Sequence, residues 1–432
     1  MKNVYIVDGT RTPFLKSRNR PGPFSASDLA AAAGKTLLAR MPFAPETLDE
    51  VILGCAAPSV DEVNIGRVAA LRMGCGISVP AWTVMRNCAS GMQSIDSAMA
   101  NILAGRAHLV LAGGADALSR APVLFSDVMV VWLADWMAAK GLGARAALLA
   151  RLRPGHLKPV IGILRGLTDP VSGLLMGQTA ENVAHRFGIT REQMDRYAAR
   201  SHERVLHAQQ SGWLSTGHDG LKAEIGPLFD RAGKFYAEDD GVRADSTASN
   251  LARLRPFFDR VYGTVTAGNS SQITDGAAWV LLADDEALER HGLVPIGRIV
   301  DLHWSGLDPA EMGLGPVHAA TPILKRHGLA LNDLDAWEIN EAFAAQVLGC
   351  VEAWKSESYC RAMLDTEALG ELDLEKLNID GGAIALGHPV GASGTRIVLH
   401  LLHVLKRTGG KRGIATICIG GGLGGAMLIE AL

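Results

Sequence analysis

Three observations predict an α/β protein made of two similar halves. First, strand-like and helix-like patterns alternate, as in VYIVDG (residues 4–9), the helical stretch 25–41 and EVILGC (50–55), which is typical of a mostly parallel sheet covered by helices. Second, residues 37–54 resemble residues 323–340 without a gap. Third, the long segment between the two ends matches neither of them. The sequence therefore predicts a duplicated α/β fold with an insertion.

The internal repeat extends to two loops and two glycine-rich turns. The stretch from Cys88 to Gly91 (CASG) aligns with the stretch from Gly391 to Gly394 (GASG), and each opens a predicted helix. Each helix leads to a strand that ends among glycines, at 108–117 and at 413–425. Because these matches keep the same order, we infer two halves packed as a pseudo-dimer, with their equivalent loops facing one another.

The predicted domain boundaries follow from the limits of this repeat. We expect the first half to span residues 1–118 and to continue at about 250–285, the inserted loop domain to span 119–249, and the second half to span 286–432. A chain of 432 residues, 48% of them hydrophobic, is long enough to bury a large core.

Charge and cysteine content exclude several classes of protein. A net charge of -3 argues against a nucleic-acid partner bound through a broad basic field. The six cysteines form no CxxC pair and no zinc-ligand spacing, so neither a metal site nor a disulfide framework is predicted. The N-terminal stretch lacks the apolar region of a secretory signal, and we expect a cytoplasmic protein with reduced thiols.

The segment 127–166 has an unusual composition. Its first part is apolar for about a dozen residues, short of the ~20 that span a bilayer. After Asp135 it carries basic residues and no acidic ones: Lys140, Arg145, Arg151, Arg153, Lys158 and Arg165. This composition fits a helix pair lying peripherally on an anionic membrane surface. A helical cover packed on its own protein or on a partner subunit fits it as well.

Cys88 lies where a thiol gains reactivity. Taken alone, a cysteine is more often a small buried apolar residue than a nucleophile. At the start of a helix, however, unpaired N–H groups and the helix dipole favour the nucleophilic thiolate. The repeat places the loop of His388, in GGAIALGHPVGASG (381–394), opposite this position. An imidazole there could take the thiol proton.

Two further stretches carry candidate residues. Cys418 ends an apolar strand before the glycines of ICIGGGLGG (417–425), which lacks the dinucleotide spacing GxGxxG and suits an oxyanion hole better than a phosphate cradle. Asn340 ends a short strand in EINEAFAAQ (338–346), and Phe343 follows at a helix. An ordinary helix cap is the alternative for Asn340, but the repeat places it at the same rim of the sheet.

Five motifs together resemble the thiolases, in the same order and over nearly the whole chain: NCASGMQ (87–93), GTVTAGNSSQITDGAA (263–278), NEAFAAQ (340–346), GGAIALGHPVGASG (381–394) and CIGGGLGGAM (418–427). The resemblance implies the thiolase fold, in which two βαβαβαββ halves form five layers, α-β-α-β-α, with an inserted loop domain.

The resemblance also implies a role for each matching residue. Cys88 would accept the acyl group, His388 would activate it, and Cys418 would move the proton of the acetyl-CoA α-carbon or of the leaving thiol. Asn340 would hold a water that forms one oxyanion hole with His388, and the N–H groups of Cys88 and Gly420 would form the other. The substrate and CoA site would include Met176, Ser271 and Phe343.

The implied reaction is the CoA-dependent cleavage of a 3-ketoacyl-CoA to acetyl-CoA and a shortened acyl-CoA, or its reverse, by a ping-pong mechanism. It needs no metal or redox cofactor, and CoA is a substrate. Many biosynthetic members have histidine before the methionine that matches Met176, whereas this chain has Leu175. The insert 127–166 and the stretch from Cys350 to Leu377 resemble the thiolase subunit of the fatty-acid β-oxidation complex. That resemblance implies a homo-oligomer, at least a dimer, and a hydratase/dehydrogenase partner subunit.

Three other functions remain open at this stage. One is a biosynthetic thiolase that forms acetoacetyl-CoA. Another is a condensing enzyme similar to the ketoacyl synthases, which would release CO₂ from a malonyl donor and would not need Cys418. The third is a non-catalytic acyl-CoA-binding scaffold, which would explain the segment 127–166 but not the reactive residues.

Overall fold

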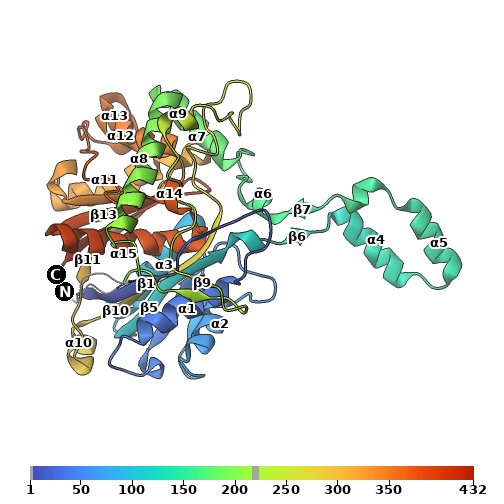
Figure 1. Ribbon diagram of the computed structural model, residues 1–432, viewed down its shortest axis with the longest axis horizontal. Coiled ribbons are helices and arrows are strands. Elements are labelled where there is room, and N and C mark those ends of the chain that lie inside the picture. Colours follow the sequence, from blue (N-terminus) through green and yellow to red (C-terminus); the bar gives the residue numbers. More distant parts are fainter. Residues whose placement is uncertain (1–2, 217–222) are drawn as a thin grey trace.

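A mixed sheet of ten strands forms the centre of the part of the chain described by the computed structural model, residues 3–216 and 223–432 (Figure 1). Its strands are β1 (Val4–Arg11), β2 (Leu15–Lys16), β3 (Glu50–Gly54), β4 (Ala81–Val84), β5 (Leu109–Ala117), β10 (Thr274–Ala283), β11 (Gly297–Gly306), β12 (Ala336–Ile339), β13 (Arg412–Ile419) and β14 (Leu423–Ala431). Their order is β12-β13-β14-β11-β1-β10-β5-β3-β4, with β2 beside β10.

The two halves of this sheet have the same topology. In the first half β3 is parallel to β4 and β5, and β10 is antiparallel to β5 and β1. In the second half β12 is parallel to β13 and bridges to Leu377, and β14 is antiparallel to β13 and β11. Antiparallel pairing of β1 with β11 joins the halves. The duplication is therefore confirmed, but the sheet is mixed rather than mostly parallel, because each half ends in an antiparallel strand.

Helices separate and cover the two half-sheets in five layers (Figure 1). The inner layer contains α3 (Ser90–Leu103) and α15 (Val390–Thr408). One outer layer contains α1 (Ala26–Leu38) and α2 (Ile65–Met73), and the other contains α11 (Gly315–His327) and α12 (Ala344–Lys355). Buried apolar side chains fill the space between successive layers. This is the α-β-α-β-α arrangement expected from the sequence.

Glycines let the two inner helices touch at the ends where the repeat begins. A β-carbon on Gly91 would lie 2.7 Å from the carbonyl oxygen of Gly391, and one on Gly394 would lie 2.6 Å from the backbone nitrogen of Met92. Either contact would be a clash. The glycines of the aligned CASG and GASG stretches therefore permit the close approach of α3 and α15 that brings the two halves' loops together.

The remaining elements lie outside the repeat or at its edges. In the insertion, α7 (Met176–Phe187) and α8 (Arg191–Gln210) pack against the second half. The smaller elements are β8 (Leu228–Phe229), β9 (Phe235–Tyr236), α9 (Ala248–Leu251), α10 (Asp285–His291), α13 (Glu357–Leu364) and α14 (Ala383–Leu386).

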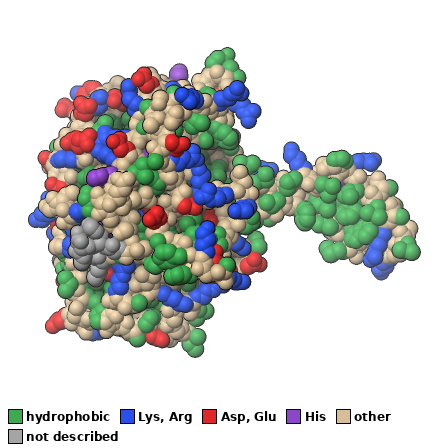
Figure 2. Space-filling view, viewed as in Figure 1, with side chains coloured by type: hydrophobic (Ala, Val, Ile, Leu, Met, Phe, Trp, Pro, Cys, Tyr) green, Lys and Arg blue, Asp and Glu red, His purple; other side chains and the backbone are tan. Residues whose placement is uncertain are grey.

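Residues 123–166 form an arm that projects from the body (Figure 1). Its stem pairs β6 (Val123–Leu124) with β7 (Val160–Ile161), its far end contains α4 (Asp127–Ala138) and α5 (Leu142–Arg151), and α6 (Gly162–Gly166) returns the chain to the body. Figure 2 shows hydrophobic side chains along this arm. The expected helix pair is present, but it does not cover its own protein. No helix among the described residues combines the length and apolar character needed to cross a membrane.

We propose the domain division expected from the sequence. The ends of the elements support it, because β5 ends at Ala117, the arm and the helices α7 and α8 lie within 119–249, and β10 returns to the first half-sheet at Thr274. The second half then begins before β11, at about residue 286.

Candidate active site

Cys88 lies in a tight turn that leads into α3. Residues Asn87–Ala89 form one 3₁₀ turn, so Cys88 precedes the α-helix rather than opening it. Asn87 has φ 43°, a left-handed conformation that asparagine tolerates better than most residues. Ser90 fixes the turn, since its Oγ donates to the carbonyl oxygen of Asn87 (2.7 Å) and accepts from the N–H of Arg86 (2.9 Å). The side chain of Cys88 is partly buried and lines a cleft of about 450 Å³.

The surroundings of Cys88 favour the neutral thiol. Burial raises the pKa of Cys88, and the charge of Asp116 adds to this, while a backbone hydrogen bond from Gly420 acts in the opposite direction. A thiol in this state needs a base that removes its proton when it attacks.

His388 is held as a neutral imidazole. Its backbone N–H donates to the carbonyl oxygen of Gln272 (3.0 Å). Its Nδ1 lies 2.6 Å from the Oγ of Ser393, and that hydroxyl donates to the carbonyl oxygen of Pro389 (3.1 Å). Nδ1–H is therefore the donor to Ser393, which leaves the lone pair on Nε2. Burial, together with the charge of Arg396, lowers the pKa of His388 to about 4.

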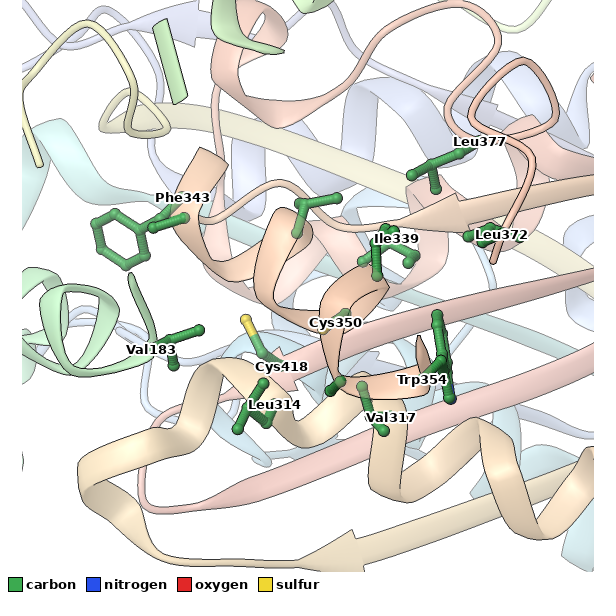
Figure 3. Close-up of a cluster of buried hydrophobic side chains, with 14 of the residues drawn as sticks. Val183, Leu314, Val317, Ile339, Phe343, Cys350, Trp354, Leu372, Leu377 and Cys418 are labelled. Atoms are coloured by element: carbon green, nitrogen blue, oxygen red, sulfur yellow. The ribbon is translucent and has the colours of Figure 1, made fainter. Parts of the chain in front are cut away.

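Cys418 lies near the end of β13, just before the glycine turn that contacts the Cys88 loop. The Nδ2 of Asn87 donates to the carbonyl oxygen of Gly420 (2.7 Å), so the two loops are tied directly. Cys418 is almost completely buried, among apolar side chains that include Leu314 and Val183 (Figure 3). Burial raises the pKa of Cys418 well above its ordinary value, with a further contribution from Cys88. Cys418 is therefore a neutral thiol.

Asn340 directly follows β12, where its N–H donates to the carbonyl oxygen of Thr416 (2.9 Å). It is completely buried, and neither Oδ1 nor Nδ2 has a hydrogen-bond partner among the described residues; the same holds for Nε2 of His388. Buried polar atoms are normally paired. Unpaired atoms on both predicted site residues therefore mark a place that is built for contacts with a bound molecule.

Glu341, the residue after Asn340, binds both α8 and the segment that leads to His388. Its carboxylate accepts from Tyr197 Oη (3.0 Å), Ser201 Oγ (2.6 Å), Asn378 Nδ2 (3.0 Å) and the N–H of Ile384 (3.2 Å). These donors come from α8 and from the stretch that leads to His388. A buried carboxylate with this many partners holds its neighbours in one arrangement.

The predicted substrate residues fall into two groups. Met176, the first residue of α7, lines the same cleft as Cys88 and Gly420, and its Sδ would lie 3.2 Å from a β-carbon built on Gly420. Ser271 and Phe343 do not line this cleft. They lie on two segments that pair with each other, since the N–H of Ser271 donates to the carbonyl oxygen of Ala342 (2.9 Å) and Ser270 bridges to Phe343.

Asp116 is a site residue that the sequence analysis missed. It is completely buried at the end of β5, and it accepts from the N–H groups of Gly391 (2.5 Å), Ala57 (2.9 Å) and Ala56 (3.3 Å) and from the thiol of Cys55 (3.2 Å). An acidic residue in the otherwise apolar stretch HLVLAGGADA (108–117) was the only available signal. The contact with Gly391 joins residues 275 positions apart.

A second buried charge lies on α15 beyond His388. Arg396 pairs with Glu338 of β12 (2.8 Å), and both side chains are buried. Burial, opposed by the charge of Arg396, raises the pKa of Glu338 to about 7. The described residues contain no group of three or more histidine, cysteine, aspartate or glutamate side chains arranged to hold a metal ion.

Two sequence families match the chain almost end to end. The family described as "Thiolase, N-terminal domain" matches residues 4–286, and "Thiolase, C-terminal domain" matches residues 293–431. A 3-ketoacyl-CoA thiolase from Yersinia pestis (strain Pestoides F) is 37% identical over 429 residues, which cover 99% of this chain and 96% of the relative.

Solved structures agree with the sequence families. Human mitochondrial 3-ketoacyl-CoA thiolase in complex with CoA matches with a TM-score of 0.83 at 36% identity and covers 100% of this chain and 98% of its own. The acetyl-CoA acetyltransferase of Bacillus anthracis also has a TM-score of 0.83 at 36% identity, with 100% and 99% covered. With matches to both domains and relatives over its full length, the chain belongs to the thiolase family.

Proposed function

We propose that this protein is a degradative 3-ketoacyl-CoA thiolase, an acyltransferase that cleaves 3-ketoacyl-CoA with CoA. The observation that carries the proposal is the meeting of two neutral thiols, Cys88 and Cys418, at loops tied by the hydrogen bond from Asn87 to Gly420. A condensing enzyme of the ketoacyl-synthase type would have no use for Cys418. The family names of the matching relatives support the same reaction.

In the proposed first half-reaction, Nε2 of His388 takes the proton of Cys88 while Sγ attacks the 3-keto carbonyl of the substrate. The bond between C2 and C3 then breaks, and the acyl group stays on Cys88. The electron pair moves to the thioester as an enolate, and Cys418 protonates its α-carbon to give acetyl-CoA. The free lone pair of His388 and the buried proton of Cys418 suit these two roles.

In the second half-reaction, the thiolate of Cys418 takes the proton of the incoming CoA thiol. The CoA sulfur attacks the acyl group on Cys88, and the thiolate of Cys88 leaves and regains its proton from His388. The products are a shortened acyl-CoA and the starting enzyme. CoA is a substrate, and this scheme uses no metal or redox cofactor.

Two oxyanion holes would stabilise the charge that develops on oxygen. We assign one to a water held by Asn340 together with His388, whose unpaired buried atoms support this role. We assign the other to the N–H groups of Cys88 and Gly420. Each donor of this kind contributes about 100- to 1000-fold in rate. The thioester and the pantetheine part of CoA would contact Met176 at the cleft and Ser271 and Phe343 on the paired segments.

We also propose that the protein is a homo-oligomer, at least a dimer. β4 is an edge strand of the sheet, and it presents Trp82 (36% exposed), with Met85 (57% exposed) directly after it. An edge with exposed apolar side chains is a site at which a second copy can pair. The edge is also near the site, because β4 leads directly into the Cys88 turn.

For the arm, we propose a peripheral contact with an anionic membrane surface in the cytoplasm. Exposed apolar side chains such as Val131 and Leu149 are accompanied by exposed basic ones such as Arg145 and Arg151. This combination suits acyl chains below charged headgroups. A hydratase/dehydrogenase subunit would be the competing occupant of the same surface.

The function is tested with Cys88→Ala and Cys418→Ala, using purified protein, 3-ketoacyl-CoA and CoA. We expect Cys88→Ala to abolish acetyl-CoA release and the mass increase of an acyl-enzyme. Cys418→Ala should lose turnover, because no other group in this scheme protonates the enolate or takes the proton of the CoA thiol. Cys75→Ala, a buried cysteine between α2 and β4, is the matched control and should retain activity. Full turnover by Cys418→Ala would contradict the assigned mechanism.

A further inference from the structure

A buried ion pair joins the strand that leads to Asn340 to the helix that follows His388. Nη1 of Arg396, on α15, donates to Oε2 of Glu338, on β12, at 2.8 Å, and each side chain is only 2% exposed. Taking two charges out of water costs about as much as their attraction returns, so a buried ion pair is weak evidence for a gain in stability. The place of this pair in the fold suggests a different role.

On the strand side, Glu338 and Asn340 share one face. Side chains alternate along an extended strand, so residues two positions apart point the same way. Trp337 and Ile339 lie on the other face, in the apolar cluster that Figure 3 shows in part. The N–H of Asn340 donates to the carbonyl oxygen of Thr416 (2.9 Å), which continues the pairing of β12 with β13. A shift of Glu338 would therefore move Asn340 with it.

On the helix side, Arg396 lies one turn beyond the residue that orients His388. Ser393, three positions before Arg396, accepts Nδ1–H of His388 at 2.6 Å. Residues three apart are neighbours on one face of a helix. The ion pair thus spans the same strand and helix as Asn340 and His388, whose buried Oδ1, Nδ2 and Nε2 atoms have no partner in the described part of the chain.

The pair also sets the charge that faces His388. Burial, together with the charge of Arg396, lowers the pKa of His388 to about 4. Burial raises the pKa of Glu338 to about 7, so near neutral pH its carboxylate balances the charge of Arg396 only in part. Other titratable groups around the pair are His400, Glu341 and Asp380 beside Glu338, and Asp116 and Cys88 beside the start of α15.

We propose that Glu338 and Arg396 are a positioning pair, which holds Asn340 and His388 at the spacing of one oxyanion hole and keeps the imidazole of His388 uncharged. The inference rests on the proposed thiolase function and adds two positioning residues to it. Neither side chain touches the substrate in this scheme, because both act through Asn340 and His388. A misplacement of about 1 Å in such a site costs about a hundredfold in rate.

Three variants separate the position of the pair from its charge. Arg396→Met removes both the charge and the bond, whereas Arg396→Lys keeps the charge and loses the guanidinium geometry. Arg396→Met combined with Glu338→Gln replaces the pair by neutral side chains, which buried sites often tolerate, and keeps the experiment informative if Arg396→Met does not fold. Arg407→Met is the matched control, because Arg407 pairs with Asp380 (2.8 Å) at the far end of α15.

The first measurement does not depend on activity. The titration of His388 is followed by NMR of protein with ¹³C-labelled histidine, in which the loss of one signal in His388→Asn identifies the residue. Removing a nearby cation favours the imidazolium form, so we expect the pKa of His388 to rise by about 1 in Arg396→Met and in the double variant. Arg396→Lys and Arg407→Met should keep the original titration.

The second measurement is steady-state thiolysis of a 3-ketoacyl-CoA. We expect kcat of Arg396→Met and of the double variant to fall by about tenfold to a hundredfold, with KM within about threefold. Arg396→Lys should recover part of the lost kcat, since it keeps the charge but not the two-pronged geometry. Arg407→Met should retain kcat.

Two results would overturn the inference. One is a titration of His388 that is the same in all variants, and the other is a double variant whose kcat equals that of Arg407→Met. Failure of the proposed function is a separate result, because the unmodified protein would then cleave no 3-ketoacyl-CoA. The NMR titration would still show whether Arg396 acts on His388.

Discussion

Asp116 joins the two halves of the fold at the candidate active site, since its Oδ2 accepts the N–H of Gly391 at 2.5 Å. Gly391 lies in the first turn of α15, three residues after His388. The other oxygen accepts from Ala57, whose loop lines the cleft with Cys88. One carboxylate therefore sets the position of the helix that directly follows His388 relative to the cleft wall beside Cys88.

Asp116→Asn is expected to reduce both stability and turnover. Each carboxylate oxygen faces a backbone N–H, so an amide must present its own NH₂ group to one of these donors. Loss of a buried charged hydrogen bond costs about 1.5–3 kcal/mol. We expect the free energy of unfolding to fall by about that amount and kcat to fall more than KM changes, as measured by chemical denaturation and steady-state kinetics.

The control for Asp116 is Cys55→Ala. It removes the thiol that contacts the same carboxylate (3.2 Å) but leaves the backbone donors in place. We expect a smaller loss of stability and near-normal kcat. If Asp116→Asn and Cys55→Ala reduced kcat equally, the contact with Gly391 would have no special part in positioning His388.

Ser393→Ala should disturb the protonation of His388. The Oγ of Ser393 accepts Nδ1–H at 2.6 Å and so keeps the lone pair on Nε2. Without it, the imidazole can adopt the other tautomer, which cannot take the proton of Cys88. We expect kcat to fall about ten- to a hundredfold, which is at most the lower end of the 10²–10⁴ that general bases supply because the imidazole itself remains, while KM changes little.

The pH profile separates this role from a purely structural one. Loss of Ser393 should move the acidic limb of the kcat/KM profile, which reports His388 in the free enzyme. Thr408→Ala, at the far end of α15, removes a comparable hydroxyl, which donates to the carbonyl oxygen of Val404 (2.9 Å). That control should leave the profile unchanged, and an unchanged profile in Ser393→Ala would contradict the assigned tautomer.

The duplication made much of the site predictable. Because aligned loops of two similar halves meet across the inner helices, the repeat alone was enough to place the loops of Cys88 and His388 opposite each other. The strand end before the glycines likewise located Cys418. Both predictions depend on local patterns, a helix start or a strand end, which a sequence records directly.

Other features depend on contacts that no local pattern records. The bond from Asp116 to Gly391 and the pairing of β1 with β11 join residues far apart in the chain. The 3₁₀ turn at Cys88 arises because Ser90 caps Asn87 from within the helix, which shifts the helix start past the cysteine. Composition indicated the two helices of the arm, but only the three-dimensional structure reveals that they project away from the body (Figure 2).

Stability should decrease at high pH because of His400. This buried side chain lies between Glu224 (2.7 Å) and Asp380 (3.2 Å). Burial alone would lower the pKa of His400, but the two carboxylates raise it to about 10. Since the folded pKa lies above the unfolded value of 6.5, the stabilisation is complete below about pH 6.5 and is lost as the pH rises towards 10.

Denaturation at several pH values measures this effect. We expect the free energy of unfolding to decrease between pH 7 and pH 10, and His400→Gln to lower stability at pH 7 and flatten that slope. The flattening distinguishes a charged His400 from a merely packed one. His185→Gln, on the exposed face of α7, should keep both the stability and the slope.

Binding of the arm to membranes should depend on its basic residues. The triple substitution of Arg145, Arg151 and Arg153 by Gln leaves the apolar side chains of α4 and α5 in place and removes charge only. Each basic residue near an anionic surface contributes about 1 kcal/mol, so the loss of three should lower vesicle affinity by about a hundredfold. The measurement is co-sedimentation with vesicles containing phosphatidylserine, at low and high salt.

Substituting Arg106, Arg231 and Arg253, which are exposed on the body, is the matched control and should preserve binding. Equal retention of both triple variants, unaffected by salt, would show that charge does not hold the arm at the membrane and would favour a protein partner.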